Sequence, residues 1–166
     1  MKITNSHVFF YGGILSNWAI VNEGITLLIG DTEYNFPTSE HVFMALKAYV
    51  FGDIDSLQAI AESVTPREAK QIGRQVKGFS DAIWDEKREE CMMSALKAKF
   101  RWSSRFRNEL LNKKYIGKTF VEASPVDCIW GIGLSENTPY IDNETSWRGK
   151  NLLGKLLTQL RDEKSK

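Results

Sequence analysis

The sequence predicts an α+β fold, a single domain over residues 1–166 in which helices predominate and a few strands form a small sheet. The length of 166 residues is that of one domain, and an apolar fraction of 42% with a charged fraction of 26% is typical of a globular protein. Helix-start signals recur along the chain, whereas strand-like runs are few and short. No internal repeat, low-complexity segment or Pro/Gly-rich linker divides the sequence.

Four segments have the composition of strands. Residues 8–11 form a short apolar, aromatic run that ends at a Gly-Gly pair. Residues 25–29 and 33–36 flank Gly30-Asp31-Thr32, a pattern that predicts a β-hairpin. Residues 119–122 predict a further strand. Segments this few and this short limit the sheet to a minor part of the fold.

The helices of the first half begin at residues suited to cap them. Residues 38–50 open with a Thr-Ser pair whose hydroxyls can accept hydrogen bonds from the first free N–H groups, and residues 55–62 predict a second, shorter helix. Thr65, with Glu68 three residues later and a proline at the first helical position, forms a capping box. The helix that it starts is predicted to end near Gly78.

The second half predicts three more helices and one long irregular segment. Ser80 caps a helix over residues 81–100, and a serine pair then begins a helix that runs through Leu111. Residues 131–149 are rich in Gly, Asn, Ser and Thr, and loops of that length in a compact domain are usually functional or disordered. Residues 150–163 are amphipathic, with an apolar stripe of Leu152, Leu153, Leu156, Leu157 and Leu160.

Charge and cysteine content exclude several classes of protein. The net charge of +1 gives no reason to expect tight, non-specific binding to nucleic acid, although a local patch could still hold one. Cys91 and Cys128 are far apart and lack the spacing of metal ligands, so we expect two reduced, buried thiols. Residues 1–8 do not resemble a signal peptide, and no apolar run approaches the roughly 20 residues of a membrane helix. We therefore expect a cytoplasmic, water-soluble protein with no membrane partner.

One pair of residues on the first predicted helix could carry chemistry. Glu40 and Lys47 are seven residues apart, which is roughly 20° short of two helical turns, so both side chains leave the same face. Phe43 and Met44 lie between them and could hold a planar base or a sugar ring. A partly buried lysine has a lowered pKa and becomes nucleophilic, and a nearby carboxylate can act as a general acid or base. The alternative is a solvated helix face that carries two unremarkable charges.

Other catalytic patterns are absent from the sequence. His41 is one of two histidines, and a lone histidine is more often structural than catalytic. Without clustered His, Cys or carboxylate residues we expect no metal site. No phosphate-binding glycine loop and no Gly-x-Ser-x-Gly motif occur, so we expect no cofactor and no serine hydrolase.

Four motifs occur in the order that one known family shows. They are Leu15-Ser16-Asn17-Trp18 preceded by Phe10; Pro37-Thr38-Ser39-Glu40-His41 with Phe43 and Lys47; residues 69–74 with Gly73-Arg74, then Trp84, Met92, Ala95-Leu96 and Lys99-Phe100; and Val121-Glu122, Asp127, Trp130-Gly131 and Gly149-Lys150-Asn151-Leu152-Leu153-Gly154. On these residues nearly the whole chain resembles the NADAR family, which is named for NAD and ADP-ribose and includes the YbiA-like N-glycosidases.

The resemblance implies a mostly helical α+β fold and metal-free cleavage of N-ribosyl bonds. It implies that Lys47 traps the ribose C1′ and that Glu40 assists as acid or base. Glu122 and Asp127 match acidic positions near the Trp-Gly turn and are further catalytic candidates. The positions that match the ligand pocket are Asn17, Trp18, Phe43, Arg74, Trp84, Trp130, Gly131 and Asn151. Trp84 and Trp130 fit buried core positions equally well.

Two basic segments bear on the substrate. Residues 97–118 hold eight Lys or Arg and one Glu, and Trp102 and Phe106 interleave with the arginines, a mixture compatible with base stacking. A second set has helical spacing and predicts one stripe along the helix that Thr65 caps: Arg67, Lys70, Arg74 and Lys77. Both segments could equally be solvated helix faces.

Three functions are consistent with these features. The leading hypothesis is an ADP-ribosyl glycohydrolase that removes ADP-ribose from guanine in DNA, because the family resemblance and the basic segments both favour it. A second is hydrolysis of a phosphoribosylamino-pyrimidine intermediate of riboflavin biosynthesis. A third is a non-catalytic module that binds ADP-ribose or NAD.

Overall fold

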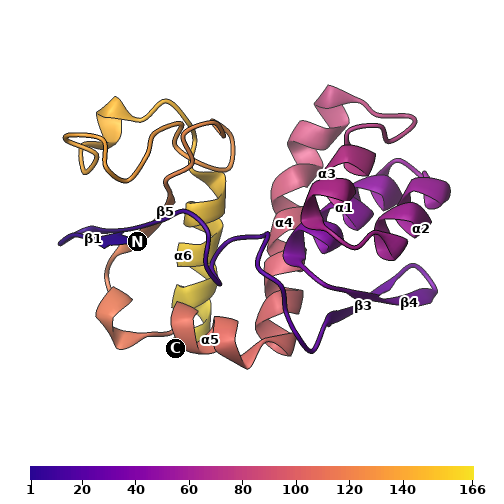
Figure 1. The fold of residues 1–166 in the computed structure, drawn as a ribbon, viewed down its shortest axis with the longest axis horizontal. Helices are drawn as coiled ribbons and strands as arrows, with labels where there is room; N and C mark the ends of the chain where they lie inside the picture. The colour runs from indigo at the N-terminus through magenta and orange to yellow at the C-terminus, as the bar shows by residue number, and fades with distance from the viewer. The chain divides into compact units, whose positions relative to one another are not determined.

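The computed structural model describes residues 1–166 and confirms the α+β class, with six α-helices and five short strands. The chain divides into two compact units, one formed by Asn17–Phe106 and the other by Met1–Ser16 with Arg107–Lys166 (Figure 1). That residues 1–166 act as a single domain stays a prediction. No helix combines the length and the apolar character that crossing a membrane requires.

The unit Asn17–Phe106 contains the predicted β-hairpin. β3 (Ile25–Ile29) pairs antiparallel with β4 (Thr32–Phe36). Gly30 and Asp31 alone form the turn, and Gly30 has a φ of +60°, which glycine adopts without a steric cost. The hairpin is therefore confirmed, with Thr32 in the strand rather than in the turn.

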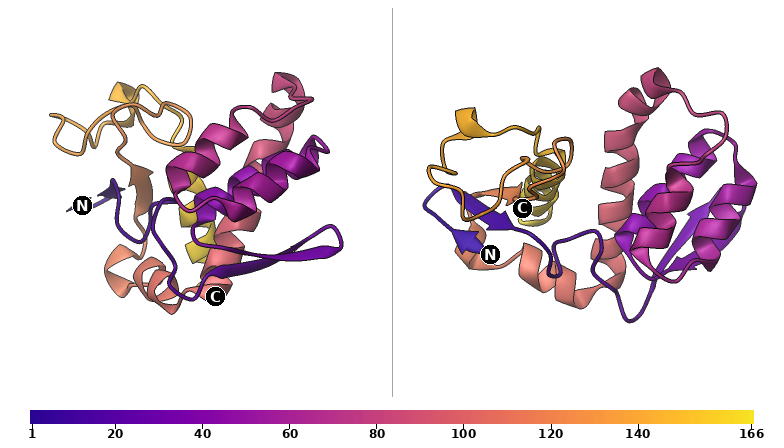
Figure 2. Two further views of the ribbon diagram at one scale, coloured as in Figure 1. Left: turned by 45° about the vertical axis from the view of Figure 1, so that its right-hand side comes forward. Right: turned by 45° about the horizontal axis from the view of Figure 1, so that its top comes forward.

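Four helices make up most of this unit: α1 (Ser39–Val50), α2 (Ile54–Glu62), α3 (Pro66–Gly73) and α4 (Asp81–Trp102). α1 packs against the other three (Figures 1 and 2). Each helix begins after a side chain that accepts a hydrogen bond from the third helical N–H. These caps are Thr38, Asp53, Thr65 and Ser80. The sequence identified all of them except Asp53.

α3 ends at Gly73, so the predicted end near Gly78 is wrong. A Cβ at Gly73 would lie 2.1 Å from the sulfur of Met44, so only glycine permits this approach of α3 to α1. Beyond Gly73 the chain turns away, and Lys77 donates its backbone N–H to Asp53 Oδ2 at 2.9 Å. The turn after α3 is thus held by a residue distant along the chain, which the local pattern does not contain.

The early end of α3 also breaks up the predicted basic stripe. Arg67 and Lys70 lie on the helix, Arg74 is its C-terminal cap, and Lys77 lies in the turn that follows. The four residues therefore do not form one continuous helical row.

The other unit holds a three-stranded sheet and the C-terminal helix. Its strands β1 (Lys2–Ile3), β2 (His7–Phe10) and β5 (Thr119–Glu122) lie in the order β1-β2-β5, with β1 antiparallel and β5 parallel to β2. α6 (Leu152–Lys164) packs against β5. α5 (Ser104–Leu110) spans the boundary of the two units. Two 3₁₀ turns complete the elements, Lys113–Tyr115 and Glu144–Ser146.

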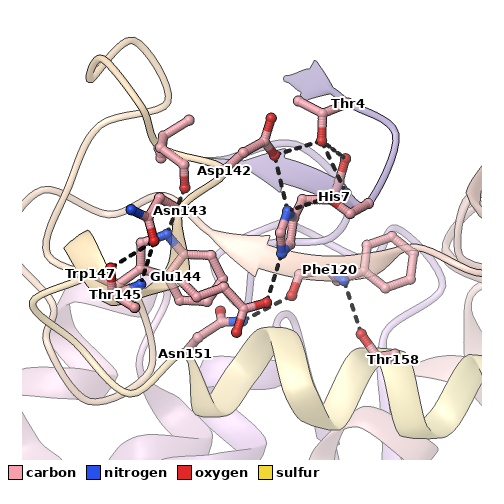
Figure 3. A network of polar contacts seen from close by, with 12 residues as sticks. Thr4, His7, Phe120, Asp142, Asn143, Glu144, Thr145, Trp147, Asn151 and Thr158 are labelled. Atoms are coloured by element: carbon pink, nitrogen blue, oxygen red, sulfur yellow. Dashed lines mark hydrogen bonds and ion pairs between the residues drawn. The ribbon is translucent and has the colours of Figure 1, made fainter.

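The outer edge of β5 has no partner strand, yet its backbone groups are all paired. Phe120 donates its N–H to Thr158 Oγ1 at 2.9 Å and accepts from Asn151 Nδ2 at 3.0 Å. Glu122 donates its N–H to Asn151 Oδ1 at 3.0 Å and accepts from the N–H of Ile132 at 3.0 Å. Figure 3 shows Asn151 and Thr158 reaching Phe120. The side chains of Asn151 and Thr158 and the backbone N–H of Ile132 thus replace a fourth strand and satisfy the backbone of β5.

The irregular segment 131–149 is held in place by a polar network (Figure 3). His7 Nδ1 lies 3.0 Å from Asp142 Oδ1, and His7 Nε2 lies 2.9 Å from Glu144 Oε1. Thr4 Oγ1 donates to the same Asp142 oxygen at 2.7 Å. Beneath this network lies an apolar core of Phe9, Val121, Ala123, Ile132, Leu134 and Ile141, against which Trp147 packs. The segment is therefore irregular, as predicted, but firmly anchored.

Candidate active site

The two residues central to the sequence prediction both lie on α1, at opposite ends. Glu40 is in the first turn and is only 6% exposed, and its backbone N–H donates to the carbonyl of Asn17 at 3.0 Å. Lys47 is in the last turn and is half-buried. Because neither side chain lies on an open surface, the alternative of a solvated helix face does not hold.

Aromatic rings surround the amine of Lys47. Its Nζ lies 4.7 Å from the ring centroid of Phe79 and 5.5 Å from that of Trp84. Phe43 packs on Trp84 at 5.3 Å between centroids, and Phe51 packs on Phe79 at the same distance. The faces of these rings attract a cation, while their bulk removes water from around it.

The surroundings of Lys47 lower the pKa of its amine. Burial is the main cause that lowers the pKa of Lys47, and the nearby Arg74 guanidinium lowers it further. The carboxylates of Glu40 and Asp81 oppose these effects only in part. A lysine in this setting carries more of the nucleophilic free base near neutral pH than an exposed lysine does.

The unit Asn17–Phe106 therefore brings together several of the predicted site residues. Phe43, Lys47 and Trp84 are linked by ring contacts, and Glu40 and Arg74 act on the charge of the lysine. Arg74 is exposed and can reach an anionic ligand.

Asn17 and Trp18 differ in their surroundings. Asn17 is buried, and its side-chain Oδ1 accepts from Ser39 Oγ at 2.9 Å while Nδ2 lies 3.2 Å from the sulfur of Met92. Asn17 therefore ties the start of α1 to α4. Trp18 is 40% exposed, so its ring remains accessible to a ligand.

His41 has a structural role, as the sequence indicated for a lone histidine. It is fully buried, with Nδ1 2.7 Å from Thr38 Oγ1 and Nε2 3.2 Å from the carbonyl of Ser63. Burial lowers its pKa. No three His, Cys, Asp or Glu side chains gather as metal ligands. Cys91 is buried, but Cys128 is exposed, so the expectation that both thiols are buried is wrong for Cys128.

The remaining predicted site residues belong to the other unit. Asp127 Oδ1 accepts the backbone N–H groups of Ile129 at 2.9 Å and Trp130 at 2.8 Å, so this carboxylate shapes the turn. A Cβ at Gly131 would lie 2.9 Å from the carbonyl oxygen of Glu122, which explains the need for glycine. Glu122 ends β5 and is half-buried, as is Trp130.

Asn151 is engaged entirely by the protein backbone. It is fully buried, has a φ of +54°, and uses both ends of its amide on β5. Its role in substrate binding stays a prediction, but the structure gives it an architectural role that the sequence did not reveal.

Phe79 and Asp81 were not singled out from the sequence. Phe79 lies between Gly78 and the cap Ser80 and is 42% exposed, although its ring contacts the amine of Lys47. The only feature of the sequence that could have indicated a role for Phe79 is that it is a large aromatic residue in a short linker that contains glycine.

Comparison with known proteins identifies the family. The NADAR domain matches residues 9–163. The chain is 36% identical to N-glycosidase R617 of Acanthamoeba polyphaga mimivirus, over 96% of this chain and 97% of that protein. It is 32% identical to N-glycosidase YbiA of Shigella boydii, over 77% of this chain and 70% of that protein. It is 35% identical to the chloroplastic riboflavin biosynthesis protein PYRR of Zea mays, over 78% of this chain but 20% of that protein. With a domain match over nearly all of its length and these relatives, the chain belongs to the NADAR family.

Proposed function

We propose that this chain is an N-glycosidase that removes ADP-ribose from guanine in DNA, with Lys47 as the nucleophile. The observation that carries the proposal is the half-buried amine of Lys47, whose pKa is lowered by burial and by Arg74. The similarity to two proteins named as N-glycosidases supports the class of reaction.

The proposed reaction has two stages. The neutral Nζ of Lys47 attacks C1′ of the ribose, the bond from C1′ to the guanine nitrogen breaks, and its electron pair leaves with the base. Glu40 supplies the proton that this nitrogen takes up. The Glu40 carboxylate then takes back a proton from Nζ. The bond from C1′ to the ring oxygen breaks, the ring oxygen takes the second proton of Nζ, and a Schiff base remains at C1′. Addition of water releases ADP-ribose and restores the free amine.

Other residues are assigned to binding in this proposal. Arg74 faces the pyrophosphate, because its guanidinium is exposed and lies near Lys47. Trp84 is partly exposed and offers aromatic surface to the sugar or base. Phe43 is only 3% exposed, so the expectation that it contacts the ligand is wrong, and its ring supports that of Trp84 instead. Glu122 and Asp127 stay catalytic candidates, and one oxygen of Asp127 is already used in its turn.

Surface charge supports a nucleic-acid substrate. Lys97, Arg101 and Arg105 are exposed at the end of α4 and the start of α5. Trp102 is 38% exposed, with the guanidinium of Arg101 5.9 Å from its ring centroid. Phe106 is fully buried, so the expectation that it joins in base stacking is wrong. Of Trp102 and Phe106, only Trp102 is exposed and can stack on a base.

The similarity to the maize riboflavin biosynthesis protein favours a second candidate, hydrolysis of a phosphoribosylamino-pyrimidine. The test compares both substrates on the same purified chain, with product release followed by mass spectrometry. We expect loss of one ADP-ribose mass from an ADP-ribosylated guanine oligonucleotide. Faster turnover of the free pyrimidine would favour the second candidate, and tight binding of ADP-ribose without any turnover would favour a binding module.

The role of Lys47 has its own test. Lys47→Ala should abolish turnover, whereas Lys87→Ala, at an exposed lysine on α4, should leave it unchanged. Borohydride added during turnover should reduce the Schiff base and leave ADP-ribose attached to the peptide that contains Lys47. Unchanged activity of Lys47→Ala, or trapping at another lysine, would rule out the proposed nucleophile.

A further inference from the structure

A cavity of about 380 Å³ lies in the unit Asn17–Phe106, where α1 ends, α2 begins and the chain turns toward α4. Pockets that bind small molecules generally measure roughly 300–1,000 Å³. Phe51, Asp55 and Lys77 are among the residues that line it. Phe51 and Asp55 were not identified as site residues from the sequence, and Lys77 was named only as part of the predicted basic stripe.

The walls of the cavity are fixed by one buried carboxylate. Asp53 accepts the N–H of Ser56 at 3.1 Å, the hydroxyl of Ser56 at 2.6 Å and the backbone N–H of Lys77 at 2.9 Å. These bonds, with that of the Ser56 hydroxyl foremost, lower the pKa of Asp53. The carboxylate of Asp53 thus joins the start of α2 to the turn that contains Lys77. Gly52, whose φ is +69°, leaves open space where a Cβ would be.

The cavity shares an aromatic wall with the surroundings of Lys47. Phe51 is the C-terminal cap of α1, four residues beyond Lys47 and about 6 Å along the helix axis. Phe79 contacts both the cavity wall and Lys47, because its ring centroid lies 5.3 Å from that of Phe51 and 4.7 Å from the Nζ of Lys47. A ligand whose sugar is held at Lys47 could therefore extend a second group into the cavity.

The chemistry of the lining defines that second group. Asp55 offers exposed acceptors and Lys77 an exposed donor, and these opposite charges give no net preference for an anion or a cation. An aromatic wall with one donor and one acceptor suits a neutral, planar heterocycle that hydrogen-bonds at its edge. We propose that this cavity binds a nucleobase, and, resting on the proposed function, that the base is the adenine of ADP-ribose.

Calorimetry with adenosine and with an unmodified oligonucleotide tests this proposal. Asp55→Asn and Lys77→Met should each weaken adenosine binding about tenfold, the effect of losing one hydrogen bond to a charged group. Asp31→Asn and Lys87→Met, at exposed positions away from the cavity, are matched controls and should bind as the parent chain does. Lys77→Met leaves intact the backbone bond to Asp53, so its melting temperature should not change.

The outcomes separate the cavity from the catalytic proposal. Lys47→Ala should keep adenosine binding while it loses turnover. If only the oligonucleotide loses affinity in the Asp55 and Lys77 variants, the cavity binds a base of the nucleic-acid strand and the assignment to adenine is overturned. If the parent chain binds neither ligand, or the variants bind both unchanged, the cavity is not a nucleobase site, whatever the turnover assay shows.

Discussion

Replacing Asn151 distinguishes an architectural residue from a ligand-binding one. The side chain is fully buried, accepts the N–H of Glu122 and donates to the carbonyl of Phe120, both at 3.0 Å. Asn151→Ala removes both bonds and leaves two backbone groups of β5 without these partners. It also places alanine at a φ of +54°, a conformation that asparagine tolerates better.

The expected loss of stability follows from these contacts. Each buried backbone group left unsatisfied costs about 1–3 kcal/mol, and the left-handed conformation adds about 1 kcal/mol for alanine. The total, roughly 3–7 kcal/mol, is a large share of the 5–15 kcal/mol that is typical of folded proteins. For a chain of this size the melting temperature should fall by about 10 °C or more.

Thermal unfolding followed by circular dichroism measures the effect, with guanidinium unfolding as a second assay. Asn151→Gly is the matched control, because it loses the same two hydrogen bonds but accepts a positive φ. It should be less destabilising than alanine by about 1 kcal/mol. An alanine variant that melts with the parent chain but has a raised KM would refute the architectural assignment and favour direct contact with substrate.

Three further perturbations test other parts of the structure. Burial lowers the pKa of Lys99 from 10.5 to about 7, so between pH 7 and pH 10.5 the unfolded chain binds more protons than the folded chain does. The free energy of unfolding, measured by denaturant titration at several pH values, should therefore rise with pH across that range. Lys99→Met should remove this dependence on pH. Gly73→Ala should cost about 1–3 kcal/mol in guanidinium unfolding because its Cβ meets the sulfur of Met44, and M44A in the same chain should recover part of that loss; additive effects would contradict the contact. Asp81→Asn removes a carboxylate that raises the pKa of Lys47, so the acid limb of kcat/KM should move to lower pH, whereas a move to higher pH would contradict the assigned electrostatics.

Helix starts were the most predictable feature of this fold. The capping box at Thr65 and the caps at Thr38 and Ser80 all occur as the sequence indicates. A cap is a hydrogen bond between residues three apart, so the local sequence contains both partners. β1 escaped prediction because two residues are too few to show an alternating pattern.

Helix ends and site contacts were less predictable. α3 ends at Gly73, and the turn that follows it is held by Asp53, a residue that the local pattern does not contain. The seven-residue spacing of Glu40 and Lys47 correctly placed both on α1, but it could not tell how deeply either is buried. Phe79 lies beside Lys47 only because the turn before α4 folds back toward α1.

By itself, the sequence determined the α+β class, the hairpin, most helix starts and a helix that carries a carboxylate and an amine seven residues apart. These features depend on interactions between residues that are close along the chain, so they can be predicted from composition and spacing. The tertiary structure alone decided that aromatic rings surround Lys47, that Asn151 satisfies the edge of β5, and that Phe51, Asp55 and Lys77 line one cavity. Such contacts join residues distant along the chain, and burial and shifted pKa values arise only once packing has excluded water.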